Sequence, residues 1–175
     1  MVDPRRLLET LHRNGVEFIV VGAVAAILQG YPLATEDLDV TPAYDAENLE
    51  RLTVALHELE ARLRVAEDPA GLEFPVASRL LAQADVWTLT TKYGDLDLVF
   101  TPPGTRGYAD LRRDAVEIDL GVPMLVASLP DVIRSKEAAG RPKDLAQLPA
   151  LRQTLELVRE RERRERERPS GGGRP

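Results

Sequence analysis

The segment at residues 37–42, DLDVTP, constrains the fold more than any other, because it alternates acidic and apolar side chains over a short strand. Residues two apart in a strand point to the same face of a sheet, so Asp37 and Asp39 share one face. Leu38 and Val40 turn to the other face. Like charges this close repel each other and are costly to bury. The pattern therefore predicts a sheet with one face packed on helices and one face left free for a site.

A second acidic pair, Asp95 and Asp97, repeats this pattern in the segment YGDLDLVF. Either pair alone also fits a surface strand whose polar residues face water. Two neighbouring strands with acids on one face, however, would repel each other without a cation. Carboxylate oxygens are the ligands that Mg²⁺ and Mn²⁺ prefer, so the two pairs together predict a metal site. As the third carboxylate we favour Asp97, which lies mid-strand, over Asp95, which follows the turn glycine.

Apolar spacing and capping residues along the rest of the chain predict a sheet backed by helices. The helices expected lie at residues 4–13, 23–29, 46–63, 76–83, 108–115 and 129–139, with a last helix starting at 143. The strands expected lie at residues 17–21 and 37–42 and in two hairpins at 85–100 and 116–127. The order predicts an α+β fold, a mixed β-sheet with helices packed on one face and a C-terminal helical segment.

Length and composition limit the class of protein. With 175 residues, 43% hydrophobic and 30% charged, the chain suits one soluble domain with a hydrophobic core. It has neither an apolar run near the roughly 20 residues of a membrane span nor a signal-peptide pattern. We therefore expect a cytoplasmic protein without a membrane partner. One domain is expected over residues 1–158, followed by a charged helix extension and disordered tail over 159–175, where charges alternate without an apolar face.

The residue types present exclude some chemistry. The chain has no cysteine, which excludes disulfides and zinc sites built on sulfur. Its two histidines, His12 and His57, fall in amphipathic helical patterns and are interpreted as surface residues. The net charge of −6 argues against passive coating of nucleic acid, although an enzyme with a locally basic pocket is compatible with it.

A glycine directly follows the first apolar strand, in the segment VVGAVAAIL. Gly22 stands at a strand-to-helix junction, where the first backbone N–H groups are unpaired and carry partial positive charge. Glycine also lets a phosphate approach the backbone closely. Many helices begin this way without a ligand, but the acidic pair that follows strengthens the interpretation as a phosphate seat.

Three basic residues gather in the segment KEAAGRPKDLAQL, at the junction of two predicted helices. Charge at a helix C-terminus explains Arg141 without any ligand. It does not explain Lys143, which begins the next helix, where the dipole disfavours a cation. An anionic ligand would resolve this conflict. Asp144 is expected either to cap that helix or to orient the arginine.

Together these segments resemble the polymerase-beta-like nucleotidyltransferase superfamily, and within it the minimal AbiEii-type branch that includes toxins of bacterial toxin–antitoxin systems. The superfamily pattern is matched by Val21-Gly22-Ala23, by Asp37-Leu38-Asp39 and by Asp97. The downstream Lys…Arg-x-Lys-Asp motif of the AbiEii-like branch is matched by Lys136, Arg141, Lys143 and Asp144. The resemblance spans residues 16–151. It departs at Ala23, where the superfamily usually has a serine whose hydroxyl contacts a phosphate.

The resemblance implies an enzyme that moves a nucleoside monophosphate from an NTP onto an acceptor and releases pyrophosphate. Asp37, Asp39 and Asp97 would be catalytic and hold Mg²⁺ or Mn²⁺, with Asp97 helping to activate the attacking hydroxyl. The nucleotide-binding residues would be Gly22, Ala23, Lys136, Arg141 and Lys143. The acceptor implied is an RNA such as tRNA, a protein or a small molecule such as an antibiotic. The toxin branch also implies an antitoxin protein as partner.

Three other interpretations compete with this one. The segment DLDVT also fits the Asp-x-Asp-x-Thr motif of haloacid-dehalogenase-type phosphatases, but that motif ends a buried strand near the start of a domain, and YPLATE is no strand. A glycosyltransferase would need a sugar-nucleotide domain that this length does not accommodate. The third is a catalytically degenerate nucleotidyltransferase fold that binds a nucleotide or a protein without turnover, and Ala23 motivates it.

Overall fold

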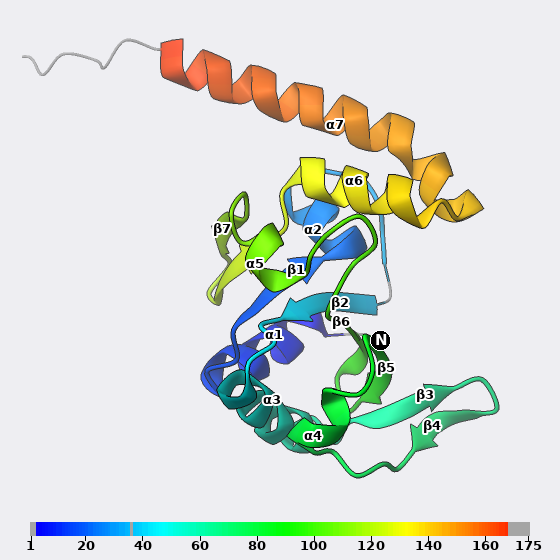
Figure 1. Cartoon of the computed structure of the whole chain (residues 1–175). Helices are drawn as coiled ribbons and strands as arrows, with labels where there is room; N and C mark the ends of the chain where they lie inside the picture. Colours follow the sequence, from blue (N-terminus) through cyan, green and yellow to red (C-terminus); the bar gives the residue numbers. More distant parts are fainter. Residues whose placement is uncertain (1–2, 36, 168–175) are drawn as a thin grey trace, which may run out of the picture.

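Eight strands form one mixed sheet in the computed structural model, which describes residues 3–35 and 37–167 (Figure 1). The strands are β1 (Phe18–Val21), β2 (Asp37–Pro42), β3 (Arg62–Val65), β4 (Asp68–Leu72), β5 (Val86–Thr91), β6 (Gly94–Val99), β7 (Val116–Asp119) and β8 (Pro123–Val126). The helices are α1 (Pro4–Arg13), α2 (Gly22–Leu28), α3 (Ala46–Glu58), α4 (Ser78–Leu81), α5 (Tyr108–Leu111), α6 (Leu129–Ala139) and α7 (Pro142–Glu167). The α+β fold predicted from the sequence is confirmed.

The strand order across the sheet is β4-β3-β5-β6-β2-β1-β8-β7. The centre is the parallel pair of β2 and β6, and β2 also pairs with β1 in antiparallel register. Both predicted hairpins form, β5 with β6 and β7 with β8. The two segments with alternating acids are therefore neighbours, although more than fifty residues of sequence separate them.

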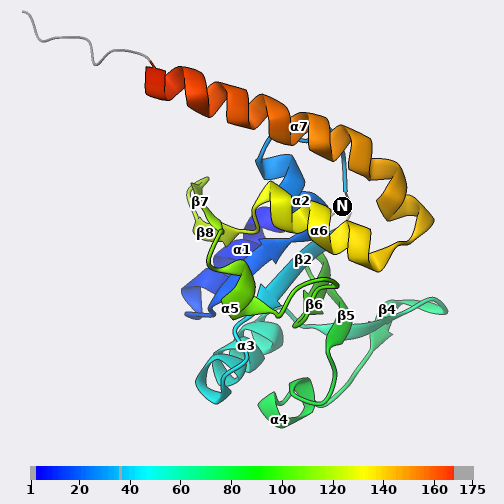
Figure 2. The ribbon, with the colours of Figure 1, turned by 45° about the horizontal axis from the view of Figure 1, so that its top comes forward.

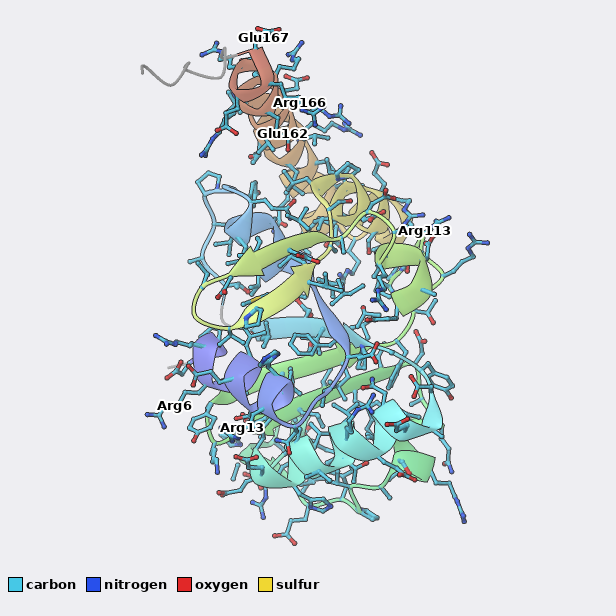
Figure 3. The ribbon with its side chains drawn as sticks, turned by 90° about the vertical axis from the view of Figure 1, so that its left-hand side faces the viewer. Arg6, Arg13, Arg113, Glu162, Arg166 and Glu167 are labelled. Carbon is cyan, nitrogen blue, oxygen red and sulfur yellow. The ribbon has the colours of Figure 1, made fainter. Side chains whose placement is uncertain are left out.

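One face of the central strands is buried under α1 and α3. Leu38, Leu96 and Leu98 have no exposed surface, and α1 contacts both β6 and α3. Figure 3 shows these two helices in front of the central strands. Burying each large apolar side chain stabilises the fold by roughly 1.5–3 kcal/mol, so this face fixes the strand register. The opposite face of the same strands carries the acids.

The helix ends follow the capping residues of the sequence. The side chains of Asp3, Asp45 and Ser128 each accept a hydrogen bond from a backbone N–H in the first turn of α1, α3 and α6. Gly140 ends α6 in the left-handed conformation, at φ +63°. These caps satisfy backbone groups that a helix end leaves unpaired.

The helix expected over residues 46–63 ends earlier than its leucines suggest. It stops at Glu58, and Glu60 adopts a positive φ of 55°, which a sequence without glycine there does not signal. Leu63 continues the leucine spacing by coincidence, because it belongs to β3 and pairs with Leu89 of β5. The sequence predicted no helix or strand between residue 64 and residue 75, where the structure has the rest of the β3–β4 hairpin. The helix expected at 76–83 is the shorter α4.

The C-terminal helices pack on each other, and α6 also contacts α2. The distal part of α7 projects away from the sheet (Figure 2). The disordered tail expected at the end of the chain falls partly on residues 168–175, which lie outside the described residues. Within the described ranges, no helix combines the length and the apolarity needed to cross a membrane.

Candidate active site

The two acidic pairs lie side by side on the face of the sheet opposite α1 and α3. In the parallel register of β2 and β6, Asp37 is the partner of Asp95 and Asp39 is the partner of Asp97. Leu38 between the first pair is fully buried, so the carboxylates point to the other face. Neighbouring strands are about 4.8 Å apart, and the structure thus concentrates four carboxylates in one small area.

Asp39 is the most perturbed member of this group. Burial, followed by the negative charges of Asp97 and Asp37, raises its pKa from the ordinary 3.8 to about 7. The positive charges of Lys136 and Lys143 oppose this rise. Burial also raises the pKa of Asp97. A site whose acids resist ionisation in this way favours an added cation.

Gly22 lies against Asp39. Val21 is the β1 partner of Asp39, and the next residue, Gly22, opens α2 with φ +64°. A Cβ at this position would lie 2.3 Å from Oδ2 of Asp39, well inside contact distance. Glycine is therefore required both by the backbone angle and by the carboxylate. The structure places the strand-to-helix junction, including the partly buried Ala23, beside the acids as the sequence suggested.

The basic cluster is organised by one buried carboxylate. Asp144 accepts hydrogen bonds from Nζ of Lys136 at 3.2 Å and from Nε of Arg141 at 2.5 Å. Burial alone would raise the pKa of Asp144, but the hydrogen bonds from Arg141 and Lys136 outweigh it and lower the pKa. Of the two roles expected for Asp144, the structure shows the one that orients the arginine.

The basic cluster acts on the acids through its positive charge. The charges of Lys136 and Lys143 act on Asp39. The raised pKa of Arg141 is due first to the hydrogen bond that it donates to Asp144, and the charge of Asp39 contributes to it. Lys143 is exposed in the first turn of α7. In Figure 1 the α6–α7 junction and the start of β2 lie on the same side of the molecule. The structure therefore brings Gly22, Asp39 and Asp97 together, and it links the basic cluster to Asp39 through charge.

Sequence reasoning missed one residue of this site, Arg64 of β3. Its Nη1 lies 2.8 Å from Oδ2 of Asp95, and its Nη2 lies 2.7 Å from Oδ1 of Asp97. The side chain is 29% exposed, so the two ion pairs are partly shielded from water. The available signal was the alternation of charged and apolar residues in the segment RLRV, which is typical of a strand. It was obscured because Leu63 also continues a helical leucine spacing.

The acids fit a metal ion only in part. Over residues 3–35 and 37–167, no group of three or more acidic, histidine or cysteine side chains is arranged to hold a metal. Asp97 is engaged by Arg64, which leaves Asp37 and Asp39 as the available oxygen donors. Mg²⁺ is usually held by one or two carboxylates together with substrate phosphates, and the pair fits that arrangement.

The two histidines take no part in the site. His12 in α1 and His57 in α3 are both exposed, as expected. The Nε2 atom of His57 lies 3.1 Å from the carbonyl oxygen of Val76.

No family model matches the sequence, and no curated protein matches it. The fold, in contrast, is similar to solved structures. One is TM1012 of Thermotoga maritima, assigned as a nucleotidyltransferase, with a TM-score of 0.54 at 16% identity, over 89% of this chain and 96% of that one. Another is the antibiotic-resistance factor ANT(2'')-Ia, with a TM-score of 0.55 at 14% identity, over 93% of this chain and 90% of that one.

A third similar structure is the lincosamide antibiotic adenylyltransferase LnuA with bound lincomycin, with a TM-score of 0.56 at 15% identity. The match covers 86% of this chain and 97% of LnuA. Identities this low establish the fold alone. The chain has a nucleotidyltransferase fold, and it spans nearly the whole length of these proteins.

Proposed function

We propose that the protein is a metal-dependent nucleotidyltransferase that transfers a nucleoside monophosphate from an NTP to a hydroxyl group of a small molecule. The observation that carries this proposal is Asp39, a carboxylate that lies against Gly22 and on which the charges of Lys136 and Lys143 act, in a nucleotidyltransferase fold. A metal ion would neutralise Asp37 and Asp39, and a phosphate would stabilise the charge of Lys143, so a metal–triphosphate complex supplies both.

The basic cluster would bind the triphosphate. Lys136 and Arg141 are held in place by Asp144, so their charges are positioned before the substrate arrives. Lys143 at the start of α7 has an exposed charge that the helix dipole disfavours, and a phosphate would stabilise it. Gly22 and Ala23 would let the phosphates approach the backbone beside Asp39. Positioning and charge neutralisation of this kind account for most of the catalysis in phosphoryl transfer.

Asp37 and Asp39 would hold Mg²⁺ or Mn²⁺ together with phosphate oxygens. The bound ion would neutralise the charge that develops on the phosphate during transfer. Asp97, the partner of Asp39 across the strands, is the residue we assign to the proton of the attacking hydroxyl. Burial raises the pKa of Asp97, which makes its carboxylate a better proton acceptor.

A small-molecule acceptor is favoured over RNA and protein by two observations. The fold neighbours include an antibiotic adenylyltransferase and an ANT(2'')-Ia complex with adenylyl-2''-tobramycin, the latter matching over 93% of this chain and 95% of that one. The net charge of −6 argues against an extended nucleic-acid surface. An antibiotic or a similar compound rich in hydroxyl groups is therefore the acceptor class we propose.

The proposal is tested by incubating the protein with labelled NTPs, Mg²⁺ and a panel of hydroxyl-bearing compounds, with total tRNA in parallel. We expect label transfer and pyrophosphate release, and we expect Asp37→Asn and Asp39→Asn to abolish both while the fold persists. Asp114→Asn, at an exposed acid beyond α5, is the matched control and should retain the wild-type rate. Transfer at the wild-type rate by both site variants would refute the proposal. Nucleotide binding without transfer to any acceptor would favour the degenerate fold that Ala23 motivates.

A toxin role is the second candidate, and the AbiEii-like motif from Lys136 to Asp144 favours it. In that case the acceptor would be a cellular RNA or protein, and an antitoxin would be the partner. Expression of the wild-type chain should then slow growth, whereas expression of Asp39→Asn should not. Equal growth of both strains at equal levels of folded protein would exclude the toxin role and leave the small-molecule proposal untouched.

A further inference from the structure

Arg64 makes the most specific contact within the acidic group. Its guanidinium lies between two carboxylates: it donates an N–H group to Oδ1 of Asp97 and forms an ion pair with Oδ2 of Asp95. The side chain of Asp97 is only 15% exposed, and that of Asp95 is 33% exposed. The charge of Asp37 also acts on Arg64. Arg64 is thus a built-in countercharge for the carboxylates of β6.

The backbone directs Arg64 to this position. The last pair between β3 and β5 is Leu63 with Leu89, and the register between β3 and β4 shifts between Leu63 and Val65. Arg64 lies at that irregularity, and such irregularities re-aim a side chain. Gly71 makes the arrangement fit, because its φ is +73° and a Cβ would lie 2.8 Å from the carbonyl oxygen of Leu63.

The proposed function, on which this inference rests, requires Asp97 to be free when the substrate is bound. In the structure it is not free, since Arg64 occupies Oδ1. Releasing Asp97 needs the loss of only one of the two ion pairs, because Asp95 can keep the guanidinium nearby. We propose that Arg64 is a positioning residue that holds Asp97 out of the metal site until the metal–nucleotide complex binds, with Asp95 as its anchor.

This role distinguishes the two acids of β6. Asp97, beside Asp39, belongs to the reacting centre, whereas Asp95, beside Asp37, serves Arg64. Once Arg64 releases it, Asp97 would join Asp37 and Asp39 as a ligand of the metal, so Arg64 and a divalent cation compete for the carboxylate of Asp97. The free protein should therefore bind a metal weakly, through Asp37 and Asp39 alone, and removal of the guanidinium should strengthen the binding.

The test is a Mn²⁺ titration of the full chain without nucleotide, with free Mn²⁺ measured by electron paramagnetic resonance at a constant pH above the pKa of Asp39. Arg64→Gln should lower the Mn²⁺ Kd about tenfold, because one charge-assisted contact no longer competes. Arg64→Lys keeps the charge without the fork and should show a smaller gain. Arg62→Gln is the matched control, since Arg62 lies on the same strand but pairs with the exposed Glu73, and its Kd should equal that of the wild type.

A double-mutant cycle separates release of Asp97 from simple charge repulsion. In an Asp97→Asn background, Arg64→Gln should bring no gain in Mn²⁺ affinity. A gain that persists there would overturn the positioning role. If Arg64→Gln does not fold by circular dichroism, Arg64→Lys decides the matter, and a Kd equal to that of the wild type would overturn the role.

The outcomes also separate this inference from the proposed function. Mn²⁺ binding that Asp39→Asn abolishes but Arg64→Gln does not improve would overturn the role of Arg64 and leave the metal site standing. Absence of Mn²⁺ binding in the wild type and in every variant would overturn both.

Discussion

At the scale of single residues, the site is defined by pairs that constrain each other. Gly22 and Asp39 are one such pair, because the missing side chain of the first leaves the space that the carboxylate of the second occupies. Arg64 and Asp97 are another, because each neutralises part of the other's charge. In both pairs, the position of one residue explains why the other residue is of its particular type.

Gly22→Ala should impair both stability and nucleotide binding. The left-handed backbone angle costs about 1–2 kcal/mol for alanine, and the added Cβ would displace Asp39. Gly30→Ala is the matched control, because Gly30 also has a positive φ, of 101°, but a Cβ added there would meet no atom within 4 Å. Thermal unfolding and NTP titration should show lower stability for both variants and weaker NTP binding for Gly22→Ala alone. Equal NTP affinities would show that Asp39 tolerates displacement.

Asp39 should make stability depend on pH in the metal-free protein. Its pKa is higher in the folded state, about 7, than the ordinary 3.8, so between these values the folded state binds more protons than the unfolded state. The free energy of unfolding should therefore fall as pH rises from about 4 to about 7, by up to about 4 kcal/mol, since one pKa unit is about 1.4 kcal/mol. Urea unfolding across this range should show the fall in the wild type and a smaller one in Asp39→Asn. Parallel curves would contradict the assigned pKa.

At the scale of elements, the helices and strands that could be predicted are those that short stretches of sequence specify by themselves. The strands β2, β5 and β6 and the caps of α1, α3 and α6 were predicted because alternation and capping residues act over a few residues. The β3–β4 hairpin was not, because the chain leaves α3 through Glu60 in a left-handed conformation that no local residue type signals. The carboxylates were therefore found from the sequence and Arg64 was not, since its role depends on a strand whose position is set by tertiary pairing with β5.

The junction of α6 and α7 offers a test of the basic cluster. Lys143→Ala should weaken NTP affinity about ten- to a hundredfold, because each charge-assisted hydrogen bond contributes about 1.5–3 kcal/mol. Stability should be unchanged or slightly higher, because a cation in the first turn of α7 is disfavoured by the helix dipole. Lys92→Ala, which removes an exposed pair with Glu60, is the control. Titration with a non-hydrolysable NTP and Mg²⁺ measures the affinity of each variant. An affinity of Lys143→Ala equal to that of the wild type would show that Lys143 is not part of the site.

At the scale of the whole molecule, α7 has two parts with different surroundings. Its first part is packed, with Leu148 and Leu151 buried, and Leu155 and Val158 lie against the core. Its distal part carries alternating charges, and Figure 3 shows Glu162, Arg166 and Glu167 at the end that projects from the body. The expectation of one domain over residues 1–158 places its boundary where this packing stops.

Removal of residues 159–175 should therefore leave the domain intact. The ion pairs lost there, such as Arg161 with Glu165 at 3.0 Å, are exposed, and pairs of this kind contribute about 0.3–0.5 kcal/mol. A chain of residues 1–158 should keep its Tm within about 2 °C and bind NTP as the full chain does. A chain of residues 1–150 is the contrasting case, because it loses the fully buried Leu151. Its free energy of unfolding should be lower by at least about 2–5 kcal/mol. A large loss of Tm or of NTP affinity in the 1–158 chain would show that the charged extension belongs to the domain.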